Sequence, residues 1–152
     1  DGWNWYIGLD NVAIYVPPAK DAVAVEELAP ESACGLSAAE LISLVVFNNG
    51  QADITSIDAG FEVGAQMVSE TFTITIPIGE SDTLNFLTPV DMSAGGSYDF
   101  AIWTALTGDE DANNDTIWFS RQNIPIISSL PYSEGFESGN GFWNASESLP
   151  IT

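Results

Sequence analysis

The stretch ELISLVVFNNG, residues 40–50, is a dense run of branched apolar residues that ends in turn-forming ones. Branched and aromatic side chains at this density favour a strand, and Asn48-Asn49-Gly50 readily adopts turn geometry. In an extended chain the side chains alternate between two faces, one with Leu41, Ser43, Val45 and Phe47 and the other with Ile42, Leu44 and Val46. The stretch therefore predicts a buried strand followed by a tight turn.

Six further stretches of this kind lie between residues 21 and 125, with Gly, Pro, Asn and Asp between them. They read DAVAVEEL, ITSIDAGFEVG, MVSETFTITIPIG, SDTLNFLTP, GGSYDFAIWTAL and NDTIWFSRQNI. No stretch of helical period and useful length competes with them. About seven short strands at this spacing are typical of two packed antiparallel sheets, so the sequence predicts an all-β, immunoglobulin-like β-sandwich.

The two ends of the chain differ from this middle part. Residues 1–18 contain one alternating strand that stops at Pro17-Pro18 and has no local partner, which indicates the last strand of a preceding domain. Residues 128–152 are rich in Gly and Ser, with isolated aromatic residues, and indicate the start of a following domain. We therefore expect one complete domain over 19–127, and we expect the chain to be a segment of a longer protein built of tandem domains.

The charge is the strongest global feature of the sequence. There are 22 acidic residues against Lys20, Arg121 and no histidine, which gives a formal charge of −20. Nothing is available to neutralise phosphates or to dock on anionic lipid, so we expect no nucleic-acid partner and no membrane binding. No apolar run approaches the roughly 20 residues that span a bilayer. Salt screens self-repulsion, so the composition favours an extracellular location.

The same composition argues against catalysis. Without histidine, Ser-His-Asp and Cys-His arrangements are excluded, and zinc would lack its usual nitrogen ligands. Carboxylates are too abundant for one pair to indicate glycoside hydrolysis. Cys34 has no second cysteine to pair with, and we expect it to be a small, partly buried thiol; the alternative is an intermolecular crosslink. We predict that the domain is not an enzyme.

The stretch GDEDANNDT, residues 108–116, gathers oxygen ligands of the kind that calcium prefers. It is not an EF-hand, because Asn114 stands where that loop needs glycine and Ser120 where it needs a bidentate glutamate. Three interpretations stay open: a plain turn, since Asp and Asn populate turns without any metal, a partner contact, and a less regular calcium site. The ligands of that site would be Asp109, Asp111, Asn113 and Asp115.

Aromatic residues offer a second candidate surface. Trp103 and Trp118 lie on neighbouring predicted strands, at opposite parity to Phe100 and Phe119, so one face of that pair is exposed or covered by an adjacent domain. We expect the tryptophans to pack in the core or between domains. The alternative is a platform on which a carbohydrate stacks.

Several short motifs resemble a known family. CGL at 34–36, NNG at 48–50 and the hairpin at 108–116 are similar to those of Ig-like repeats, related in style to CARDB modules, in very large secreted surface proteins of Bacteroidota. GLDNVAIY at 8–15 and LPYSEGFESGNGFW at 130–143 resemble the closing and opening strands of MAM or laminin-G-like jelly rolls. The resemblance implies export by the type IX secretion route, display at the cell surface, and an adhesive or scaffolding role without catalytic residues.

The same resemblance suggests glycosylation. Asp82-Thr83-Leu84 and Asp115-Thr116-Ile117 are similar to the Asp-Ser/Thr-apolar acceptor of Bacteroidota O-glycosylation, which would place sugars on Thr83 and Thr116. Together these features predict a structural or adhesive repeat that stacks on neighbouring domains of the same chain. Homo-oligomers or filaments, and a cell-surface or glycan ligand, are further expected partners. The alternative is an accessory carbohydrate-binding module of a secreted multidomain enzyme.

Overall fold

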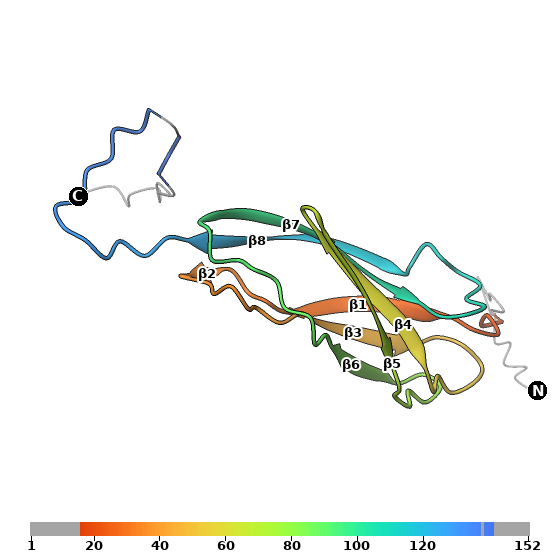
Figure 1. The fold of residues 1–152 in the computed structure, drawn as a ribbon. Coiled ribbons are helices and arrows are strands. Elements are labelled where there is room, and N and C mark those ends of the chain that lie inside the picture. The colour runs from red at the N-terminus through yellow and green to blue at the C-terminus, as the bar shows by residue number, and fades with distance from the viewer. Residues whose placement is uncertain (1–15, 138, 142–152) are drawn as a thin grey trace, which may run out of the picture.

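The computed structural model describes residues 16–137 and 139–141 (Figure 1). These residues form two sheets, with strand orders β1-β3-β6 and β2-β8-β7-β4-β5. The strands are β1 (Ala22–Ala29), β2 (Ala33–Cys34), β3 (Ser43–Asn48), β4 (Ile57–Val63), β5 (Gln66–Phe72), β6 (Ser81–Asn85), β7 (Gly96–Ala105) and β8 (Thr116–Ile124). The predicted all-β sandwich is confirmed.

Each of the seven predicted stretches contains one strand. The stretch at 67–79 is divided, because β5 ends at Phe72 and the residues after it cross to the other sheet. Within this crossing segment, Ile76 pairs with Ile54 in an isolated bridge. The strand that the sequence did not predict is β2, a two-residue segment that pairs in parallel with the end of β8. Cys34 lies in it and is exposed, so the prediction of a partly buried thiol is wrong. A short strand at the edge of a sheet leaves its side chains in solvent.

The core lies between the two sheets and follows the alternation of the strands. On β3 the buried apolar side chains are Leu44 and Val46, on the face that the sequence pattern separates from Val45 and Phe47. Aromatic rings join the two layers, because Phe86 makes edge-to-face contacts with Phe61 and Phe72, with ring centroids 5.1 and 5.2 Å apart. Such pairs contribute roughly 0.5–1.5 kcal/mol beyond their buried area.

Two buried asparagines fasten the connections between strands. The Asn48 side chain donates hydrogen bonds to the carbonyls of Ala52 and Ile76 and accepts one from the Gly50 amide. At the other end of the sandwich, Asn123 donates to the Met92 carbonyl and accepts from the Leu36 amide. Each asparagine thus hydrogen-bonds to backbone groups in the connections between strands.

The chain enters and leaves the sandwich at opposite ends. Figure 1 shows that β1 begins at the end where the connection between β7 and β8 lies, whereas β8 finishes at the far end, beside β2. The connection at 106–115 reaches β1 directly, because the Ala22 amide donates to Asp109. The described residues that flank the strands, 16–21 before β1 and 125–137 after β8, therefore lie at opposite ends of the domain.

The flanking predictions fall mostly outside the described residues. The single strand predicted within 1–18 lies outside them up to residue 15, and the tail 128–152 is described over 128–137 and 139–141, where it has neither strand nor helix. The described strands all lie within the predicted domain at 19–127. Within the described part of the chain, no helix has the length and apolar character needed to cross a membrane.

Candidate functional site

The predicted metal ligands lie together in the connection between β7 and β8, residues 106–115, which we call the acidic loop. The loop turns at Gly108, where φ is +84° and glycine is favoured, and the Asp109 amide donates to the Leu106 carbonyl. It packs against the segment before β1: the Glu110 amide donates to the Lys20 carbonyl, and the Lys20 ammonium donates to the Thr107 carbonyl. The acidic loop and the linker into β1 therefore form one hydrogen-bonded unit.

Asp109 is the central acceptor of this unit. One carboxylate oxygen accepts the Ala22 amide at 2.8 Å, and the other accepts the Asp111 amide at 2.9 Å. Charged acceptors make stronger hydrogen bonds to backbone N–H groups than neutral ones do. Asp109 thus fixes both the turn of the acidic loop and the first residue of β1.

Asp111 and Asn113 make a smaller local arrangement. The Asp111 Oδ1 atom accepts hydrogen bonds from the backbone amide and the side-chain amide of Asn113, at 3.2 and 2.9 Å. Side chains of Asp and Asn in turns often bond to backbone groups two residues along. These hydrogen bonds shape the turn.

Asp115 ends the acidic loop in an unfavourable environment for a carboxylate. Its pKa is raised to about 6, first by burial and then by the negative charges of Asp109, Asp21 and Asp111. A hydrogen bond from the Thr104 hydroxyl acts in the opposite direction. Asp115 therefore holds a proton more readily than an ordinary aspartate.

Asp21 is the residue of this cluster that the sequence did not single out. Its exposed fraction is 1%, and its carboxylate accepts hydrogen bonds from the side-chain amides of Asn49 and Asn114. The Oδ1 atom of Asn114 is buried and has no hydrogen-bond partner among the described residues. In the sequence Asp21 looks like a linker residue beside Lys20, and only the docking of the acidic loop buries it.

The arrangement is not a ready-made metal centre. In the range 16–137 and 139–141, no three His, Cys, Asp or Glu side chains are placed to hold a metal ion together. The carboxylates point instead at amides, as described for Asp109 and Asp111. The calcium site at Asp109, Asp111, Asn113 and Asp115 stays a prediction.

The two predicted glycosylation sites lie on strands. Thr83 is the middle residue of β6 and pairs with Val45 on β3, with its side chain on the outer face of the three-stranded sheet. Thr116 is the first residue of β8 and pairs with Trp103. Both threonines are partly buried. Glycosylation at these positions stays a prediction.

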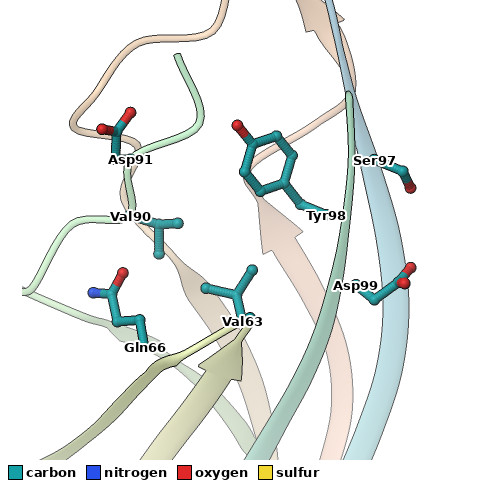
Figure 2. Close-up of a pocket in the computed structure, with 8 residues that line it drawn as sticks. Val63, Gln66, Val90, Asp91, Ser97, Tyr98 and Asp99 are labelled. Atoms are coloured by element: carbon teal, nitrogen blue, oxygen red, sulfur yellow. The ribbon is translucent and has the colours of Figure 1, made fainter. Parts of the chain in front are cut away.

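A cleft of about 310 Å³ opens beside the start of β7, between the β4–β5 turn and the segment that carries Val90 and Asp91 (Figure 2). Tyr98 points into it, but its hydroxyl already donates to the Ala94 carbonyl, and the Gln66 amide donates to the Pro89 carbonyl. Hydrogen bonds from Ser93 lower the pKa of Asp91. The cleft lies at the small end of the range for ligand pockets. Of the residues beside it, Ser97 and Asp99 point to the side of β7 opposite Tyr98 (Figure 2).

The predicted burial of the tryptophans is only partly right. Trp103 is half-buried, whereas Trp118 has an exposed fraction of 74% on the outer face of the five-stranded sheet. Phe100 and Phe119 stack on the inner side with ring centroids 4.8 Å apart. The opposite parity of the two pairs is therefore confirmed. Trp118 does not pack in the core of the described domain, and its packing against an adjacent domain stays a prediction.

Comparison with solved structures supports the fold. The CARDB domain of a Pyrococcus furiosus protein, solved in solution, aligns with a TM-score of 0.52 at 16% identity, over 70% of this chain and 96% of that one. A crystal structure of the same domain in complex with di-metal ions gives 0.54 at 16% identity, over 78% and 100%. A domain of a "putative cell surface protein" from Methanosarcina acetivorans gives 0.54 at 19% identity, over 72% and 93%.

No family model and no curated protein resembles the chain closely enough to count as a match. At identities below 20%, the structural likeness shows a shared fold, and that fold is the CARDB-like two-sheet sandwich. The CARDB part of the resemblance seen in the sequence is thereby confirmed at the level of the fold.

Proposed function

We propose that this domain is a non-catalytic structural module of a large extracellular surface protein. The observation that carries the proposal is the placement of the chain ends, since β1 begins and β8 finishes at opposite ends of the sandwich (Figure 1). A module with this geometry lengthens a protein by its own long dimension each time it is added. The linkers VPPAKDA and IPIISSLP contain prolines that restrict hinge motion.

Two further features support this function. One structural neighbour is a domain of a "putative cell surface protein". At 19% identity that likeness shows a shared fold, and here it supports the proposed location. The formal charge of −20 and the lack of histidine fit a salt-rich exterior and a role without acid–base catalysis. From the sequence motifs alone, we propose that the protein is exported by the type IX secretion route of Bacteroidota. The same motifs suggest that its neighbouring domains are MAM or laminin-G-like.

The acidic loop belongs to the same proposal. The Pyrococcus domain was crystallised with di-metal ions, and in this chain the loop gathers Asp109, Asp111 and Asp115 at the junction with the preceding segment. Calcium there would stiffen the junction between modules. The alternative function, a carbohydrate-binding module of a secreted enzyme, would be favoured by a catalytic domain in the full-length sequence.

Surface labelling tests the proposed function. Antibodies raised against residues 19–127 should bind intact cells of the source organism, and an added protease should remove that signal without lysing the cells. A signal that appears only after permeabilisation would contradict a surface location. A periplasmic marker and a cytoplasmic marker, followed in the same samples, control for leakage.

A further inference from the structure

The outer face of the five-stranded sheet combines aromatic and acidic side chains. The registers of β4, β5, β7 and β8 place one row across it: Met67, Glu62, Ala101 and Trp118 are paired in that order. Met67 and Trp118 have exposed fractions of 69% and 74%. Glu62 and Trp118 lie on either side of Ala101, two strand spacings or about 10 Å apart. Because Ala101 contributes only a methyl group, no bulky side chain separates them.

The next row fixes the second tryptophan. Gly60 pairs with Trp103, and a Cβ atom added to Gly60 would lie 2.5 Å from the indole, so the ring lies over the glycine. Trp103 therefore covers Gly60 on β4, beside the row that carries Ala101 and Trp118. The face therefore offers one fixed indole and one freely exposed indole on adjacent strands.

All charges at outward positions of β4, β5, β7 and β8 are negative. They are Asp58, Glu62 and Asp99, and Figure 2 shows Asp99 pointing to the side of β7 opposite Tyr98. Asp58 and Asp99 each accept a hydrogen bond from a neighbouring hydroxyl. Glu62 is exposed and makes no hydrogen bond or ion pair with any described residue. Its carboxylate is the one best placed to meet a ligand.

The chain itself offers no cation for this face. Arg121 forms an ion pair with Glu27 and lies over the Phe119 ring, on the other side of β8. Lys20 is engaged at the acidic loop. A second copy of the chain would bring its own charge of −20 against these carboxylates. The negative charge of this face therefore disfavours binding of a second copy of the chain and of anionic ligands.

We propose that this outer face docks a basic polypeptide segment, with an Arg or Lys side chain over the Trp118 indole and its charge toward Glu62. A cation within about 6 Å of a tryptophan ring is attracted by the ring quadrupole, and tryptophan is the best aromatic partner. The opposite charge comes from Glu62, which pairs with Ala101 across β4 and β7, and from Asp99, two residues before Ala101 on β7. This inference goes beyond the proposed structural role, because it assigns the module a partner.

Titration of the isotope-labelled chain with a blocked tri-arginine peptide, followed by NMR at low salt, tests the proposal. The largest shifts should fall on the Trp118 indole N–H and on the amides of 60–62, 99–103 and 116–120. Trp118→Ala and Glu62→Gln should each weaken binding about two- to fivefold. Trp118→Leu should weaken it as much as Trp118→Ala, because leucine keeps apolar area but not the ring.

Glu80→Gln is the matched control. Glu80 is an exposed glutamate before β6 in the other sheet, and the described residues give its side chain no partner. It should bind the peptide like the wild type to within about 1.5-fold, because its charge lies before β6 in the other sheet and does not contact a peptide docked over Trp118. Equal losses in Glu62→Gln and Glu80→Gln would reduce the binding to net charge and overturn the proposal.

Two other outcomes would also overturn it. Largest shifts on the acidic loop would place the peptide at the other end of the sandwich. A neutral hexasaccharide that shifts the Trp118 indole more than the peptide does would make the face a sugar platform. Neither result would bear on the surface labelling that tests the proposed function.

Discussion

Single acidic residues here have individual structural roles that the net charge conceals. Asp109 accepts hydrogen bonds from two backbone amides. Asp21 is buried and accepts hydrogen bonds from two asparagine side chains. Asp115 is partly buried near three other carboxylates. The same side-chain type therefore stabilises the fold at one position and opposes it at another. Direct measurement can separate these contributions.

Asp115 should make the stability of the domain depend on pH. Its pKa is raised from 3.8 to about 6 by burial and by neighbouring carboxylates, so the folded state binds a proton more tightly than the unfolded state. The resulting stabilisation is fully present below pH 3.8 and is lost as the pH rises through about 6. Asp115→Asn should therefore be more stable than the wild type at pH 8, by about 1 kcal/mol after allowance for solvent screening.

Urea denaturation at a series of pH values measures this difference. The advantage of Asp115→Asn should disappear near pH 4, where the wild-type carboxyl is protonated. Asp91→Asn is the control, because hydrogen bonds from Ser93 lower the pKa of Asp91 and its replacement should bring no gain at high pH. A constant difference between Asp115→Asn and the wild type at all pH values would contradict the assignment.

Gly60 should tolerate no side chain. A Cβ atom there would meet the Trp103 ring at 2.5 Å and the Val68 carbonyl oxygen at 2.6 Å, and the second of these is backbone. Gly60→Ala should lower the free energy of unfolding by about 1–3 kcal/mol and alter the near-ultraviolet circular dichroism of Trp103. Gly135→Ala, whose added Cβ meets only the Glu137 side chain at 3.6 Å, should leave both unchanged. Equal effects of the two substitutions would show that Trp103 does not lie over Gly60.

At the scale of elements, alternation of apolar residues predicts the long strands well, because a buried face leaves a period of two in the sequence. It predicts strands at β3 and β7 and separates the two faces of β3, but the structure shows which face is buried. It does not predict β2, since two residues carry no period. Alternation alone also does not show which face of β8 lies in solvent. The sequence therefore places Trp118 in the core or between domains, whereas its side chain is exposed on the described domain. The burial of Asp21 depends on contacts with residues 49 and 114, which no local pattern shows.

The acidic loop should stabilise the domain through hydrogen bonds even without calcium. Asp109→Ala removes the acceptor of the Ala22 and Asp111 amides and should lower the free energy of unfolding by about 1–2 kcal/mol. The loss should be the same in excess chelator, measured by urea denaturation. If calcium binds there as well, the wild type alone should gain stability on adding it.

Glu80→Ala serves as the control for Asp109→Ala, since the same class of charge is removed from an exposed site in the other sheet. It should change the free energy of unfolding by less than about 0.5 kcal/mol. A loss in Asp109→Ala that appears only with calcium present would show that the residue acts as a ligand and that its hydrogen bonds contribute nothing.

At the scale of the whole molecule, the charge of −20 should make stability rise with salt. The folded state holds the carboxylates closer together than the unfolded chain does, and about 0.1 M salt already shortens the screening length to about 10 Å. The melting temperature should therefore increase from low salt to about 0.5 M NaCl. Sucrose at equal osmolality controls for effects other than screening, and a melting temperature that falls in NaCl would contradict the dominance of repulsion.

The proposed function requires that the domain act as a rigid spacer, with neighbouring domains continuing from the opposite ends at which β1 begins and β8 finishes (Figure 1). Small-angle X-ray scattering of this domain joined to the domains that precede and follow it in the full-length protein measures this directly. The maximum dimension should grow with each added domain by nearly the full length of that domain, and the particle should scatter as a rod. A compact particle, with the neighbours folded back along the sheets, would contradict the claim.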